Sequence, residues 1–139
     1  MRYAPLWALI GLICLAGCGG GDGAVNAGNG GIGNTIVGKW SASTIQAPGG
    51  VAQSCPTSVT VGGIQYACGL VDTRVYHDGG AYDEVLGGQR GTWTVNGNTL
   101  TVAIPGQPDV VYSYSISGSV LTLQLATNGG PVTFTLQRQ

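Results

Sequence analysis

The chain has 139 residues, which is enough for one folded domain. Five basic and six acidic residues give a net charge of −1, and charged residues make up only 8% of the sequence. Because nucleic-acid binding needs clustered Lys and Arg to neutralise phosphates, this balance argues against a nucleic-acid partner. Abundant glycine, at 26 residues, together with frequent Ser, Thr and Asn, is typical of secreted β proteins.

The N-terminal segment, residues 1–17, has the layout of a secretory signal peptide. Arg2 precedes a nearly uninterrupted apolar run over residues 6–16. The segment leads into Leu15-Ala16-Gly17-Cys18, which resembles the lipobox of bacterial lipoproteins. This resemblance implies that Cys18 receives a diacylglyceryl group and becomes the first residue after cleavage. Since Gly19 rather than Asp follows, it also implies an outer-membrane anchor facing the periplasm. An ordinary signal peptide and a buried apolar segment are the alternatives.

Residues 18–35 predict a flexible tether between the lipid and the folded domain. They are rich in Gly and Asn and show neither a strand period nor a helix period. Gly28, Gly30 and Gly33 match the spacing of a dinucleotide-binding loop. That chemistry requires a strand before the loop and a helix after it, and the sequence predicts neither at these positions. We therefore assign no phosphate site here.

Two cysteines lie beyond the leader and the lipidation site. An oxidising periplasm favours a disulfide between this pair, Cys55 and Cys68. Residues 57–61 and 64–68 flank a Gly-Gly turn and predict a hairpin whose open end brings the two cysteines together. A metal pair with His77 is the alternative, although a zinc site would need one more ligand.

The first strand is predicted over residues 36–45, which are rich in β-branched and aromatic side chains and end at a Pro-Gly-Gly turn. Residues 71–76 and 81–86 predict a hairpin around an Asp-Gly turn. This hairpin carries most of the titratable groups, namely Asp72, His77, Asp78, Asp83 and Glu84. Since the sequence places no nucleophile beside them and their spacing fits no known metal loop, we expect a solvated hairpin with no catalytic or metal role.

Residues 93–102 and 114–123 repeat one pattern, and each copy predicts a hairpin. An Asn96-Gly97 loop would pair Trp93 with Leu100, and a Ser117-Gly118 loop would do the same in the second copy. Alternation then places the apolar side chains on one face and the hydroxyls on the other. The predicted apolar face comprises Trp93, Val95, Leu100, Val102, Ile104, Tyr112, Tyr114, Ile116, Leu121, Leu123, Leu125, Val132, Phe134 and Leu136.

Successive hairpins with one apolar face predict an all-β fold over residues 36–139. We expect a small antiparallel up-and-down meander of about eight strands that closes into a barrel, because closure removes exposed strand edges. Gly38-Lys39-Trp40, the Asp78-Gly79 hairpin, and the turns at 96–100 and 117–121 resemble the bacterial lipocalin-like domains of the calycin group.

The resemblance implies roles for three residues far apart in the chain. Gly38 and Trp40 would close the barrel floor, with Arg138 packed over the tryptophan. The inward side chains Trp93, Tyr112, Tyr114 and Phe134 would form a possible binding interior. These side chains are large, and a barrel of about eight strands is just wide enough to be filled by its own side chains, so we expect no deep cavity.

The sequence therefore predicts a lipid-anchored cell-envelope lipoprotein with a noncatalytic binding or interaction module, and a monomer without a cofactor. Its expected partners are the membrane, through Cys18, and a small apolar ligand or an envelope protein. The alternatives are a carrier that holds a small apolar ligand in an internal barrel cavity, and a module like the calycin-type periplasmic inhibitors of proteases.

Overall fold

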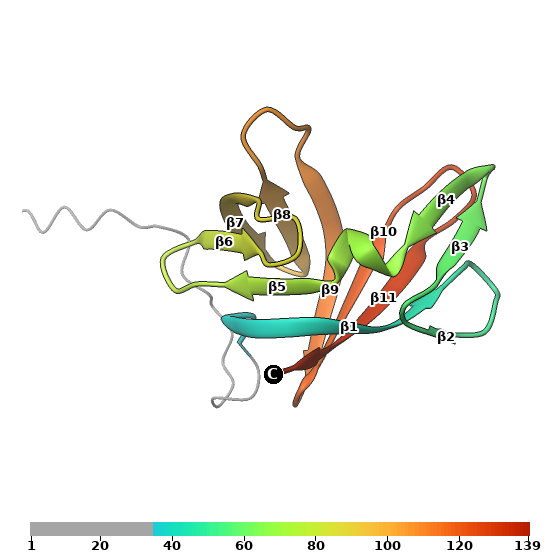
Figure 1. Cartoon of the computed structure of the whole chain (residues 1–139), viewed down its shortest axis with the longest axis horizontal. Coiled ribbons are helices and arrows are strands. Elements are labelled where there is room, and N and C mark those ends of the chain that lie inside the picture. The colour runs from blue at the N-terminus through green and yellow to red at the C-terminus, as the bar shows by residue number, and fades with distance from the viewer. Residues whose placement is uncertain (1–34) are drawn as a thin grey trace, which may run out of the picture.

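The structure, a computed structural model, describes residues 35–139, so the predicted leader, Cys18 and nearly all of the tether lie outside the described part. Its elements are β1 (Gly38–Gln46), β2 (Gln53–Ser54), β3 (Ser58–Val61), β4 (Ile64–Ala67), the 3₁₀ turn η1 (Cys68–Val71), β5 (Thr73–Tyr76), β6 (Ala81–Glu84), β7 (Arg90–Asn96), β8 (Thr99–Ala103), β9 (Val110–Ser117), β10 (Val120–Leu125) and β11 (Val132–Arg138) (Figure 1). Within these residues, no helix is long and apolar enough to cross a membrane.

The first and last strands close the sheet. β1 pairs with β5 on one side and with β11 on the other, and all pairings around the ring are antiparallel (Figure 1). The ring has eight strands, β1 and β5 to β11, joined in the order of the sequence from β5 onward. This confirms the predicted all-β fold and its closed meander. Closure satisfies the backbone groups that an open sheet would leave unpaired at its edges.

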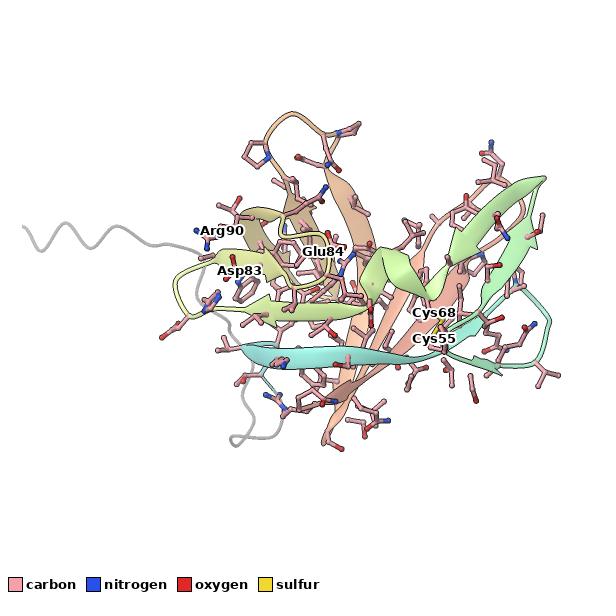
Figure 2. All side chains as sticks on the ribbon, in the orientation of Figure 1. Cys55, Cys68, Asp83, Glu84 and Arg90 are labelled. Atoms are coloured by element: carbon pink, nitrogen blue, oxygen red, sulfur yellow. A yellow bond between two sulfur atoms is a disulfide. The ribbon has the colours of Figure 1, made fainter. Side chains whose placement is uncertain are left out.

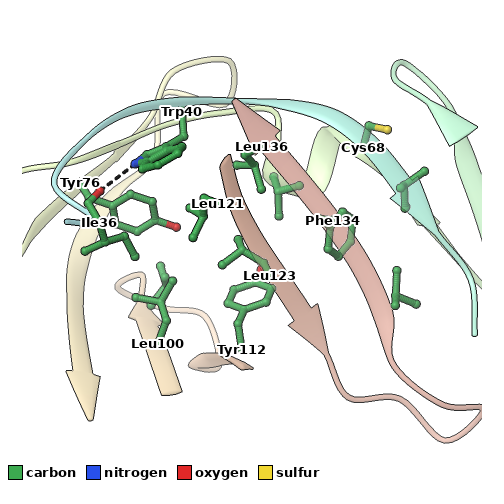
Figure 3. Packing of buried hydrophobic residues seen from close by; sticks show 14 of the residues in the cluster. Ile36, Trp40, Cys68, Tyr76, Leu100, Tyr112, Leu121, Leu123, Phe134 and Leu136 are labelled. Atoms are coloured by element: carbon green, nitrogen blue, oxygen red, sulfur yellow. Dashed lines mark hydrogen bonds between the residues drawn. The ribbon is translucent and has the colours of Figure 1, made fainter. Parts of the chain in front are cut away.

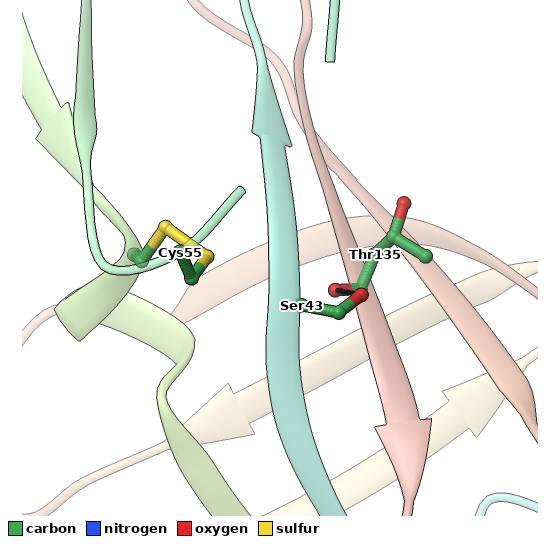
Figure 4. Close-up of a disulfide and its surroundings, with 4 residues drawn as sticks. Ser43, Cys55 and Thr135 are labelled. Carbon is green, nitrogen blue, oxygen red and sulfur yellow. Dashed lines mark hydrogen bonds between the residues drawn. A yellow bond between two sulfur atoms is a disulfide. The ribbon is translucent and has the colours of Figure 1, made fainter. Parts of the chain in front are cut away.

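A β-bulge interrupts the pairing of β1 with β11 at Ser43, since the register shifts between Ala42 and Thr44. The Ser43 hydroxyl donates to the carbonyl of Thr135 at 2.9 Å, and the Ser43 carbonyl accepts from the amide of Cys55 at 2.9 Å. Figure 4 shows Ser43 and Thr135 on the two strands and Cys55 on the neighbouring segment. The extra residue lets β1 hold β11 and the disulfide loop at the same time.

The β3–β4 hairpin is a separate two-stranded sheet outside the ring, as Figure 1 shows. A disulfide joins Cys55 to Cys68, with their Cα atoms 5.8 Å apart, at the open end of this hairpin (Figure 2). The Cys68 amide also donates to the Thr57 carbonyl at 2.9 Å. The predicted hairpin and its disulfide are therefore confirmed, and the bridge fixes the hairpin to η1.

The predicted turn register in the repeated hairpins is wrong by two residues. In β7–β8, Val95 pairs with Leu100 and Trp93 with Val102, so the two-residue loop is Gly97-Asn98. The β9–β10 loop is shifted in the same way, to Gly118-Ser119. Gly97 and Gly118 have φ of 60° and 59°, and a tight hairpin needs this left-handed conformation at its first loop position. A shift of two keeps every side chain on its predicted face.

The inner faces of the strands form the core. Figure 3 shows how residues from both ends of the chain meet there: Trp40, Tyr76, Leu100, Leu121, Leu123, Phe134 and Leu136. All of them are completely or almost completely buried. Because aromatic and leucine side chains fill the inside of so narrow a barrel, packing here supplies most of the apolar burial of the domain.

Candidate functional site

The predicted closing contact lies where β1 meets β11. Trp40 and Arg138 are direct partners in the register, and the Arg138 guanidinium carbon lies 4.2 Å from the centre of the Trp40 ring. Its Nη1 donates to the Val37 carbonyl at 2.8 Å and its Nη2 to the Thr35 carbonyl at 2.5 Å. The Trp40 indole nitrogen donates to the Ile36 carbonyl at 2.7 Å, which Figure 3 marks. Together these bonds fix the segment that leads into the barrel.

Gly38 belongs to the same contact because its missing side chain leaves space for the Arg138 guanidinium. A Cβ atom at Gly38 would lie 2.7 Å from Nη1 of Arg138, and the residue has φ of +135°. An L-residue rarely adopts this backbone conformation, and its side chain would displace the guanidinium. Arg138 thus lies against both of the other residues that the lipocalin resemblance assigned to barrel closure, Gly38 and Trp40.

The four residues predicted for a binding interior do not form one lining. Trp93 and Phe134 are buried in the packed core, and the Trp93 indole nitrogen donates to the His77 carbonyl at 3.0 Å. Tyr114 is only half-buried and lies at the edge of the core. Tyr112 is buried beside the guanidinium of Arg74, a residue for which the sequence predicted no role.

Arg74 is the buried charged residue of this domain, with 5% of its surface exposed. It lies on β5, and its guanidinium carbon is 5.5 Å from the Tyr82 ring centre and 5.8 Å from that of Tyr112. Its Nη2 donates to the carbonyl of Leu70 in η1. Among residues 35–139, no carboxylate lies within ion-pair distance of it. Since an arginine stays protonated even when buried, the barrel encloses an unpaired positive charge.

Phenol hydroxyls accompany this charge. The rings of Tyr76 and Tyr82 lie 5.5 Å apart, and within the described residues neither hydroxyl has a hydrogen-bond partner. The Nε of Arg74 is also buried without a partner there. Burial raises the pKa of Tyr76 to about 12, opposed by the positive charge of Arg74, and burial also raises the pKa of Tyr82. Both phenols are therefore protonated donors at neutral pH.

A sequence signal for this group existed. Arg74 and Tyr76 are two residues apart on β5, so their side chains lie on the same face of the strand. Because Tyr76 is aromatic, that face was a candidate for the inward one. Val75, however, is apolar and points the other way, so both faces of this short strand read as half-apolar. The alternation therefore did not identify Arg74 as an inward residue.

The charged hairpin is a surface feature. His77 Nε2 lies 2.7 Å from Asp83 Oδ2, and Arg90 Nε lies 3.4 Å from Asp83 Oδ1, with all three side chains well exposed. Asp78 accepts from the Gly79 amide at 3.0 Å within the turn. Figure 2 shows Asp83 and Arg90 together, with Glu84 beyond them. Exposed ion pairs of this kind contribute little to stability, and the described residues hold no cluster of three or more metal-ligating side chains.

Open hollows also lie on the surface near these strands. One of about 220 Å³ is lined by residues of the β6–β7 connection, including Asp83, Glu84 and Arg90. Another of about 340 Å³ lies between the start of β7 and the β8–β9 loop, against Gly91, Pro105 and Asp109. Both face solvent, so neither encloses a ligand as a barrel interior would. Inside the barrel, the Nε of Arg74 and the hydroxyls of Tyr76 and Tyr82 lack hydrogen-bond partners among residues 35–139, as does the Nε of Arg138 at the closing contact.

Comparisons of this chain with protein families, with characterised proteins and with solved structures found no match.

Proposed function

We propose that this protein is a lipid-anchored component of a bacterial cell envelope, whose lipocalin-like barrel is a noncatalytic binding module. Two features of the sequence and structure support the location. Leu15-Ala16-Gly17-Cys18 resembles a lipobox, and the pairing of Cys55 with Cys68 suits an oxidising compartment outside the cytoplasm. The tether at 18–35 would hold the barrel away from the lipid surface.

The observation that carries the binding role is the buried charge of Arg74. A protein interior seldom holds a charge without a counter-ion, because burial removes the hydration that stabilises it. Here the Nε of the Arg74 guanidinium and the hydroxyls of Tyr76 and Tyr82 keep hydrogen-bonding capacity that residues 35–139 do not use. Such unused capacity in a small barrel is what a ligand site requires before its ligand binds.

A surface interaction module is the second candidate, and the β3–β4 hairpin favours it. This hairpin stands outside the barrel, and Ile64 at its turn is 55% exposed. An exposed apolar side chain at the tip of this hairpin, whose base the disulfide holds, would offer a contact to another envelope protein. Native mass spectrometry of the protein extracted from its own envelope separates the two candidates, since one predicts a bound small molecule and the other a bound chain.

Lipid anchoring is tested by replacing the lipidation cysteine. Cys18→Ala should leave unprocessed or soluble protein that takes up no labelled fatty acid, whereas the wild type should fractionate with membrane. Cys14→Ala is the matched control, because Cys14 lies within the leader and would be removed with it. Recovery of the wild type as a soluble, unacylated protein would refute the anchor.

A further inference from the structure

The donors around Arg74 come from two adjacent strands and share one chemical character. Arg74 and Tyr76 lie on β5, and Tyr82 lies on β6 opposite Tyr76 in the register. A guanidinium only donates hydrogen bonds, and the two protonated phenols have donors to spare. A group that satisfied all three would therefore be an acceptor, and the enclosed positive charge selects an anionic one.

Among residues 35–139, no carboxylate fills this position. Glu84 is the cross-strand partner of Arg74, but it forms no ion pair with Arg74, and its carboxylate lies beside Gly87 at the β6–β7 turn. Asp83 on the same strand is engaged on the outside by His77 and Arg90. Within residues 35–139, Arg74 thus has no counter-charge.

We propose that the Arg74 guanidinium and the hydroxyls of Tyr76 and Tyr82 form a buried site for the carboxylate of a small ligand. This inference rests on the proposed binding function and names its ligand class. A carboxylate carries one charge, which matches the single cation, and its two oxygens suit the planar donors of a guanidinium. A phosphate ester would bring more charge than these groups neutralise.

The site lies close to one end of the barrel. Leu70 in η1 supplies the carbonyl that Arg74 contacts, and its side chain is 47% exposed, so η1 connects the guanidinium to the protein surface. Val85, whose amide donates to the Thr73 carbonyl beside Arg74, is also exposed. These apolar side chains would contact the body of an acid whose carboxylate reaches Arg74.

The test uses the full processed protein in mild detergent, with acetate, benzoate and benzyl alcohol as probes. We expect benzoate to raise the melting temperature in a saturable way, because a ligand that binds only the folded state stabilises it. An equal response to acetate shows that the carboxylate alone is recognised, and a response to benzoate only shows that the apolar body contributes. No response to either carboxylate, or an equal response to benzyl alcohol, overturns the proposal.

Substitutions test whether the response to benzoate depends on Arg74 and the two tyrosine hydroxyls. Tyr82→Phe removes a hydroxyl that has no hydrogen-bond partner within residues 35–139, so it should leave folding intact and raise the Kd for benzoate about tenfold. Tyr66→Phe, on strand β4 of the hairpin outside the ring, is the matched control and should leave the Kd unchanged. Arg74→Gln should abolish the response. An unchanged Kd in Tyr82→Phe and Tyr76→Phe would overturn the site even if Arg74→Gln fails to fold.

A failure of the carboxylate site can be distinguished from a failure of the proposed function. If the protein from its own envelope carries a bound molecule without a carboxylate and shows no response to benzoate, the carboxylate site is wrong and the binding module stands. If Cys18 proves unacylated while benzoate binds, the anchor is wrong and the site stands.

Discussion

Arg138 and Arg74 both lie inside the barrel strands and both stack on aromatic rings, yet their surroundings differ. Two backbone carbonyls, of Thr35 and Val37, accept from the Arg138 guanidinium, and its side chain is only partly buried. Arg74 is almost fully buried and has the one carbonyl of Leu70. The first arginine joins segments a hundred residues apart and, within residues 35–139, leaves only its Nε without a partner. The second also leaves its Nε without a partner there, and it lies beside two phenol hydroxyls that have none either.

This difference indicates that the two arginines serve different ends. Arg138 is only partly buried and uses both of its Nη groups on backbone carbonyls, so its stacking and hydrogen bonds add to the stability of the closed barrel. Arg74 loses its hydration and recovers only part of it, so its burial costs stability that a hydrophobic side chain would not. Residues kept at such a cost are commonly functional.

The largest expected effect is at the closing end. Trp40→Ala should lower the free energy of unfolding by about 3–5 kcal/mol, because the indole is completely buried and bonded to Ile36. Urea unfolding followed by circular dichroism measures it. Val111→Ala, at a position that is 50% exposed, is the control and should change stability by less than about 0.5 kcal/mol. A loss below about 1 kcal/mol for Trp40→Ala would mean that the closing end is not tightly packed.

The disulfide tests the end near η1, which carries Leu70 over Arg74. Replacing Cys55 and Cys68 together by Ser should lower the free energy of unfolding by about 3 kcal/mol, as expected for a short closed loop. Thiol labelling of the native wild type is the companion measurement and should modify neither cysteine. Reaction of both thiols without reductant would show that the bridge is absent.

Gly38 tests how closely Arg138 fits. Gly38→Ala should cost about 1–3 kcal/mol, because it strains a positive φ and places a methyl group against the guanidinium. Gly69→Ala is the control, since a Cβ there meets no neighbouring atom and φ is not positive. Equal thermal unfolding of the two variants would show that the space at Gly38 is not required.

Coupling between Trp40 and Arg138 is a smaller effect and more specific to closure. A double-mutant cycle with alanine at each position should give an interaction free energy of about 0.5–2 kcal/mol, the range for a guanidinium over an indole. Arg138→Ala alone should cost less than Trp40→Ala. A cycle with no interaction free energy would show that the contact between Trp40 and Arg138 does not stabilise the barrel.

Much of the fold was predictable because its signals are local. Alternation of apolar and hydroxyl side chains in residues 93–102 and 114–123 identified the inward faces, and glycine turns marked the hairpins. The disulfide followed because the hairpin between its cysteines was itself readable. The closing contact of Trp40 with Arg138 is long-range, and it came from the lipocalin resemblance together with the parity of Arg138 on the last strand.

What the sequence missed has physical reasons. A register shift of two residues keeps each side chain on its face, so alternation could not distinguish the Asn96-Gly97 loop from Gly97-Asn98. The strand β5 has four residues and apolar groups on both faces, so Arg74 carried no inward signal. A buried charge also contradicts the rule from which inward faces are predicted, and such exceptions tend to be functional sites.

The central claim is that Arg138 serves the fold and Arg74 serves a ligand. It is tested most directly by urea unfolding of Arg138→Met and Arg74→Met, each in the same detergent with and without benzoate. We predict that Arg138→Met loses about 1–3 kcal/mol and is still stabilised by benzoate. Arg74→Met should stay within about 1 kcal/mol of the wild type and lose the benzoate effect. Destabilisation of Arg74→Met as large as that of Arg138→Met, with the benzoate effect retained, would contradict the account.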